Sequence, residues 1–121
     1  MSILNVDTIK NRSGTEMYLA KAWVNFNGTG TVAIRASGNV SSITDNGTGD
    51  YTVNFTTAFA DANYCVVISG GALNSSTDSV MNGSIYDNVA VPTTSALRVI
   101  TADAAGGSAR DYQRICVTVF R

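Results

Sequence analysis

The stretch "SSITDNGTGDYTVNFTTAF" (Ser41–Phe59) contains two polar–apolar segments joined by a glycine-rich turn. In its second half Tyr51, Val53 and Phe55 alternate with polar residues, and this period of two is typical of a half-buried antiparallel strand. The intervening "NGTG" supplies Asn46-Gly47, a pair that readily adopts the positive φ angles of a tight hairpin turn. The stretch therefore predicts a β-hairpin.

The same alternation recurs along the 121-residue chain, while helical periodicity is nearly absent. Further strands are predicted over Tyr18–Phe26, Thr31–Ser37, Asn63–Ser69, Ser79–Asp87, Ala96–Asp103 and Asp111–Arg121. Asn63–Ser69 is apolar on both faces, as a central strand would be, and Asn82-Gly83 predicts a bend or bulge. Together these segments predict an all-β protein, an antiparallel, jelly-roll-like β-sandwich of about seven or eight strands.

The first 16 residues differ from the predicted sandwich domain, residues 17–121. Ile3, Leu4, Val6 and Ile9 place apolar side chains on both faces of an extended arm that is too short to form its own core. Such an arm needs a partner, either the edge of its own domain or another subunit, and we favour another subunit. Only 14% of all residues are charged, a composition that suits burial of part of the surface against other copies.

Net charge and hydropathy restrict the other partners. The formal net charge is −1 and no run of Lys or Arg occurs, which argues against nucleic acid and against an anionic membrane. No apolar stretch approaches the roughly 20 residues of a membrane span, and none is long enough for a signal peptide. We therefore expect synthesis in a cytoplasm and no membrane insertion.

Few residues are suited to catalysis. The absence of histidine excludes Ser-His-Asp and Cys-His arrangements and most zinc sites. Cys65 and Cys116 lie in apolar runs and are interpreted as buried, with a disulfide between them left open. A Ca²⁺ site in "DNGTGD" (Asp45–Asp50) is disfavoured, because the hairpin already explains these residues. A glycosidase pair is disfavoured too, because the candidate carboxylates sit at strand ends and turns, where Asp usually bonds its own backbone: Asp61, Asp78, Asp87, Asp103 and Asp111. We expect no catalytic residues, metal or cofactor.

The two longest predicted loops, residues 69–79 and 103–111, are the candidates for recognition. Polar and aromatic side chains in and beside them could contact a sugar or a protein surface: Asn74, Asp78, Arg110, Asp111 and Tyr112. The alternative is a plain solvated loop. Trp23 is interpreted as core or interface packing rather than as a platform for a sugar ring.

Three segments carry a resemblance to a known family. "ILNVDTIKNRSGTE", the long central stretch "KAWVNFNGTGTVAIRAS" continuing into "VSSITDNGTGDYTVNFT", and the ending "ICVTVFR" together resemble bacteriophage tail-fibre and related virion proteins. The resemblance covers most of the chain and is weaker between Leu73 and Ala109. It implies a homotrimeric β-domain without catalytic residues, in which the arms bundle about a threefold axis or dock onto a neighbouring virion protein.

The resemblance and the composition lead to one expected function. We expect a virion structural protein, a homotrimeric tail-fibre or fibre-tip domain that attaches to host-surface carbohydrate or protein, synthesised in the host cytoplasm and located in the virion. Each contact with the host would be weak, and several copies on one particle would raise the overall avidity. The alternative is a capsid decoration or cement protein that stabilises the head. A glycan-depolymerising enzyme is a less favoured third reading.

Overall fold

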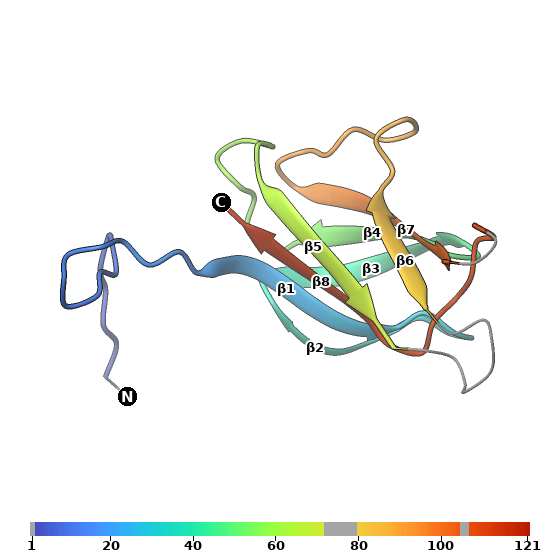
Figure 1. Cartoon of the computed structure of the whole chain (residues 1–121), viewed down its shortest axis with the longest axis horizontal. Coiled ribbons are helices and arrows are strands. Elements are labelled where there is room, and N and C mark those ends of the chain that lie inside the picture. The colour runs from blue at the N-terminus through green and yellow to red at the C-terminus, as the bar shows by residue number, and fades with distance from the viewer. Residues whose placement is uncertain (1, 72–79, 105–106) are drawn as a thin grey trace.

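The computed structural model describes residues 2–71, 80–104 and 107–121, and these residues form eight strands in two four-stranded antiparallel sheets (Figure 1). The strands are β1 (Ala20–Asn27), β2 (Ala33–Gly38), β3 (Val40–Gly47), β4 (Asp50–Phe55), β5 (Cys65–Gly70), β6 (Met81–Ile85), β7 (Ala96–Asp103) and β8 (Ile115–Phe120). This arrangement confirms the predicted all-β sandwich.

One sheet has the strand order β2-β1-β8-β5 and the other has the order β3-β4-β7-β6. Strands β1 and β2, β3 and β4, and β6 and β7 are antiparallel neighbours in sequence within one sheet, and every other connection between consecutive strands crosses from one sheet to the other. The segment before β1 leaves the sandwich at one end, where the C-terminus also lies (Figure 1). We call residues 2–19 the arm.

The core fills the space between the two sheets. Tyr51, Val53 and Phe55 of β4 point inward, as their alternation predicts, and the inward positions of β7 and β8 follow the same period. The buried apolar side chains are Ala22, Val24, Phe26, Val40, Tyr51, Val53, Phe55, Leu97, Val99, Tyr112, Ile115, Val117 and Val119. Phe26 and Tyr51 meet edge to face with ring centroids 5.2 Å apart, which joins the two layers.

The predicted hairpin forms, but its turn lies at residues 48–49, two residues beyond the predicted pair Asn46-Gly47. Gly47 and Gly49 have the positive φ angles, 137° and 63°, and Gly47 pairs with Asp50 across the turn. Asn46 belongs to β3 instead and uses its side chain to contact β4. Two glycines close together compete for the turn, and the sequence pattern alone selected the wrong pair.

Three local predictions are wrong. β5 is an edge strand, not a central one, and β1 begins at Ala20 rather than at Tyr18. β6 pairs with β7 without a bulge. The glycine in β6 has another reason: a Cβ at Gly83 would overlap the side chain of Ile68, so β5 and β6 approach closely only without it.

The cysteines also differ from the prediction. Cys65 is exposed and Cys116 is half-buried, and both are free thiols. Cys65 lies opposite Phe120 on β8, whereas Cys116 lies opposite Ser69, so the two cysteines occupy separate rows of the sheet. They face away from the core, because the inward positions of β8 are taken by Ile115, Val117 and Val119.

Candidate functional site

The arm contains a closed turn of its own. Lys10 and Glu16 form an isolated antiparallel backbone pair, and the Met17 N–H donates to the Ile9 carbonyl at 2.8 Å. Inside the turn the Asn11 Oδ1 accepts hydrogen bonds from the backbone N–H groups of Ser13 (3.0 Å) and Thr15 (2.9 Å). Asn side chains commonly stabilise turns in this way. The arm thus has no strand over residues 2–8, where the chain bends at Asp7, and it folds back on itself over residues 9–17.

The arm carries most of the exposed large apolar side chains of the described chain. Ile3 is 75% exposed, Leu4 83% and Tyr18 79%. The other arm members of this set are Val6, Ile9, Met17 and Leu19. Full burial of one such aliphatic side chain is worth about 1.5–3 kcal/mol, so leaving several in water forgoes considerable stabilisation. A contiguous exposed apolar segment of this kind is typical of an interaction site.

A hollow of about 590 Å³ lies where the arm meets the end of the sandwich. Its lining mixes apolar side chains, among them Ile9 and Met17 from the arm and Phe120 from β8, with charged ones from both the arm and the sandwich. The full lining is Val6, Asp7, Thr8, Ile9, Glu16, Met17, Tyr18, Leu19, Lys21, Phe120 and Arg121. Of these lining residues, Val6 and Ile9 belong to the interface predicted from the sequence, whereas Met17 to Leu19 and Phe120 do not. The run of consecutive apolar residues at Met17–Ala20, which breaks the strand alternation, was the available signal.

The outer surface of the β2-β1-β8-β5 sheet adjoins this hollow at Lys21 and Phe120. Trp23, 43% exposed, lies at its centre with its ring against Gly38, where a Cβ would overlap the indole nitrogen. Thr118 lies beside Trp23 in the pairing register, and Val67, 53% exposed, lies beside Thr118. We call this surface the Trp23 face; its outward residues are Lys21, Trp23, Asn25, Arg35, Ala36, Cys65, Val67, Ser69, Cys116, Thr118 and Phe120. Trp23 is therefore not part of the core.

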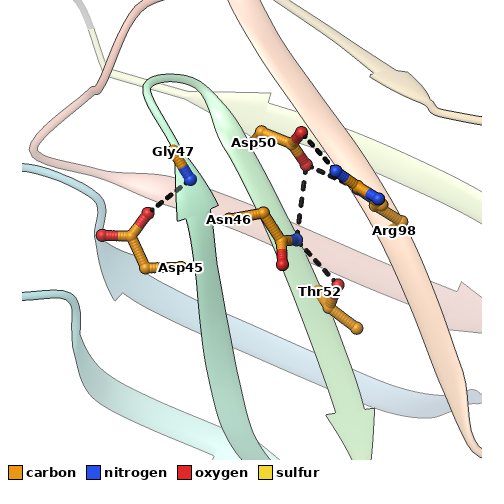
Figure 2. A network of polar contacts seen from close by, with 6 residues as sticks. All are labelled: Asp45, Asn46, Gly47, Asp50, Thr52 and Arg98. Carbon is orange, nitrogen blue, oxygen red and sulfur yellow. Dashed lines mark hydrogen bonds and ion pairs between the residues drawn. The ribbon is translucent and has the colours of Figure 1, made fainter. Parts of the chain in front are cut away.

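The outer surface of the opposite sheet is polar and internally paired (Figure 2). The Arg98 guanidinium donates twice to the Asp50 carboxylate, from Nε to Oδ1 at 2.8 Å and from Nη2 to Oδ2 at 2.7 Å. The Asn46 amide donates to the Thr52 hydroxyl at 2.9 Å and, more weakly, to Asp50. The hydrogen bonds from Arg98 hold the pKa of Asp50 below its usual value. Arg98 also lies over the ring of Tyr86. We call this surface the polar face.

The predicted recognition loops divide into two cases. Asn74 and Asp78 lie outside the described residues. Tyr112 is fully buried and donates from its hydroxyl to the Ala102 carbonyl at 3.2 Å, so it offers no stacking face to a ligand. The Asp111 Oδ1 accepts from the Gly49 N–H at 2.7 Å and from the Tyr51 hydroxyl at 2.6 Å.

Arg110 has a structural contact as well. Its Nε donates to Asp103 at 3.0 Å, and the Arg110 carbonyl accepts the hydroxyl proton of Thr101 at 2.7 Å. Residues 110–112 thus fasten the end of β7 and the β3–β4 turn to the start of β8. The structure does not bring these three residues together as an outward-facing contact site.

The described part of the chain contains neither a candidate metal site nor a candidate membrane-spanning helix. Within residues 2–71, 80–104 and 107–121, no group of three or more metal-ligating side chains is close enough to hold an ion. Over the same residues, no helix is long and apolar enough to cross a membrane.

Comparison of the chain with protein-family models, with curated proteins and with solved structures finds no match.

Proposed function

We propose that this protein is a structural subunit of a bacteriophage particle, a homotrimeric tail-fibre or fibre-tip domain that attaches to the host surface. The observation that carries the self-assembling part is the arm, whose side chains Ile3 and Leu4 are exposed to 75% and 83%. The sequence resemblance of "KAWVNFNGTGTVAIRAS" and the segments around it to tail-fibre proteins supports the virion part.

A closed ring of identical chains suits such an arm. Each copy presents the same apolar segment, and cyclic symmetry lets every copy both give and receive one without leaving any arm unpaired. Several copies on one particle would then raise the avidity of individually weak contacts with a host carbohydrate or protein. The activity proposed is adhesion, and no bond is made or broken.

The alternative is a capsid decoration protein that uses the same exposed arm to clamp neighbouring capsid subunits. The arm alone does not distinguish a fibre tip from a capsid decoration protein, because an apolar segment can dock on a sister chain or on another virion protein. Competition separates them: the purified fibre tip should reduce adsorption of the phage to its host cells, whereas a capsid decoration protein should leave adsorption unchanged.

The assembly is tested by the molar mass in solution. The native chain at micromolar concentration should show the mass of a trimer by light scattering, and Ile3→Ser together with Leu4→Ser should shift the mass towards the monomer. Val89→Ser with Val91→Ser is a matched control, because these valines are 56% and 74% exposed but lie far from the arm in sequence, after β6. A native chain that is monomeric at all concentrations would contradict the proposal.

A further inference from the structure

The two surfaces that the fold leaves apolar have complementary charge. Residues 2–8 of the arm, "SILNVDT", carry a single charged side chain, the carboxylate of Asp7, beside the apolar Ile3, Leu4 and Val6. The four strands of the β2-β1-β8-β5 sheet carry two charged side chains, Lys21 and Arg35, and both are cationic. An apolar, acidic segment and an apolar, cationic surface thus occur in the same chain.

The arm of a given copy does not cover its own Trp23 face. Ile3 and Leu4 are among the most exposed apolar residues described, and Trp23 and Val67 remain 43% and 53% exposed in the same structure. Val6 and Asp7 line the hollow beside Lys21 and Phe120, but the N-terminal end of the arm lies well away from the strands (Figure 1). Both surfaces are therefore left open in the single chain.

The dimensions of the two surfaces agree. A segment of seven residues can reach about 23 Å when it is fully extended, at roughly 3.3 Å per residue. A sheet of four strands is about 15–20 Å wide at the usual spacing of roughly 4.8 Å. Residues 2–8 are therefore long enough to cross all four strands, and one end of the path opens into the hollow at Lys21 and Phe120.

We infer that residues 2–8 of one copy pack across the Trp23 face of a second copy. Leu4 and Val6, which lie on the same side of an extended segment, then cover Trp23 and Val67, and Asp7, at the bend of the segment, lies near Lys21 or Arg35. The charge complementarity favours a second copy as the occupant, because the acidic apolar segment and the cationic apolar face come from the same sequence and exchange between copies satisfies both. This inference rests on the proposed self-assembly and replaces a simple bundle of arms with arm exchange.

Cross-linking tests the location directly, because Cys65 supplies a native exposed thiol on the Trp23 face. Leu4→Cys under mild oxidation should give covalent oligomers on a non-reducing gel, and peptide mapping should join the introduced thiol to Cys65. Leu4→Cys with Cys65→Ser should lose that species. As a matched control, Ser84→Cys is added to this double variant, because Ser84 lies on the outward side of β6 in the other sheet. The resulting triple variant should not restore cross-linking between the arm and the sandwich.

The outcomes distinguish this inference from the proposed function. Oligomers linked only between two introduced thiols would support bundled arms and overturn docking on the Trp23 face, while self-assembly would stand. Equal cross-linking to position 84 and to Cys65 would likewise overturn the location. A native chain that is monomeric by light scattering would overturn both.

A charge exchange provides a second, independent measurement. Asp7→Lys should weaken association by about twofold to fivefold at low salt, the range of an exposed ion pair, and by less at high salt. Lys21→Glu with Arg35→Glu, introduced into the Asp7→Lys chain, should restore association. Failure of this rescue, in a protein whose circular dichroism spectrum is native, would contradict the predicted contact between Asp7 and the cations.

Discussion

Asp111 should be among the most important side chains for the stability of the sandwich, although it lies in a loop. Its Oδ1 accepts the Gly49 N–H at 2.7 Å and the Tyr51 hydroxyl at 2.6 Å, and thereby ties the β3–β4 turn to the start of β8. Tyr51 is fully buried, and its hydroxyl lies 3.1 Å from a second acceptor, the Gly28 carbonyl. Burial, reinforced by Asp111, raises the pKa of the Tyr51 hydroxyl well above its ordinary value, so the hydroxyl stays a donor.

The cost of Asp111→Ala follows from these contacts. A hydrogen bond to a charged group contributes about 1.5–3 kcal/mol, and a buried donor left without a partner costs about 1–3 kcal/mol. The Tyr51 hydroxyl can turn to the Gly28 carbonyl, but the Gly49 N–H loses its acceptor. We therefore expect a loss of about 2–4 kcal/mol in the free energy of unfolding. Tyr51→Phe should cost only about 1 kcal/mol, because Asp111 keeps Gly49 and can accept from water.

Urea unfolding followed by far-UV circular dichroism measures this difference. Protein concentration must be held fixed, because association stabilises the folded state by mass action. The midpoint should fall with an unchanged m-value, and the thermal midpoint should drop by about 8–15 °C. An Asp111→Ala protein within about 0.5 kcal/mol of the native chain, or a Tyr51→Phe protein that is the less stable of the two, would refute the reasoning.

Two further substitutions test the packing between the sheets and the polar face. Gly83→Val should lower the free energy of unfolding by about 1–3 kcal/mol in urea unfolding, because the added atoms overlap Ile68. Ser84→Val, on the outward side of β6, should change the free energy of unfolding by less than about 0.5 kcal/mol. Equal effects of the two substitutions would contradict this packing. Asp50→Asn should cost about 0.5–1 kcal/mol near pH 7. The pKa of Asp50 is lower in the folded state than in the unfolded state, so this cost should be present above the ordinary carboxyl pKa and should vanish as the pH falls through the folded pKa. If the difference in stability between the two proteins stays constant down to about pH 2, the ion pair with Arg98 is not its source.

Sequence periodicity predicts this fold well because the side-chain alternation of a half-buried strand is visible locally. It does not show which apolar residues a strand buries in its own core and which it offers to a partner. For that reason β5 was predicted to be central, although Cys65 and Val67 point outward at the sheet edge. The same ambiguity explains Tyr18 and Leu19, which the predicted strand Tyr18–Phe26 included although β1 begins at Ala20.

The positions of Asp111 and Tyr112 could not be predicted, for a different reason. A polar residue in a predicted loop is expected to face solvent, and only the tertiary fold brings Asp111 next to Tyr51, 60 positions earlier. Tyr112 is likewise buried by strands distant in sequence, since its hydroxyl reaches the Ala102 carbonyl on β7. Contacts at this sequence separation leave no local pattern, so the prediction could identify the loop but not the direction of its side chains.

The two outer faces of the sandwich then have different roles under the proposed assembly. On the polar face Asp50 is paired with Arg98, and Asn54 donates to the Ser42 and Thr44 hydroxyls, so these groups already satisfy one another and gain little from a second copy. The Trp23 face has apolar area and cations but no carboxylate of its own. Copies that associate through the Trp23 face would present the polar face outward. Its dense, rigid array of hydroxyl, amide and charged groups, rather than residues 110–112, is therefore the surface on which a host carbohydrate should be sought.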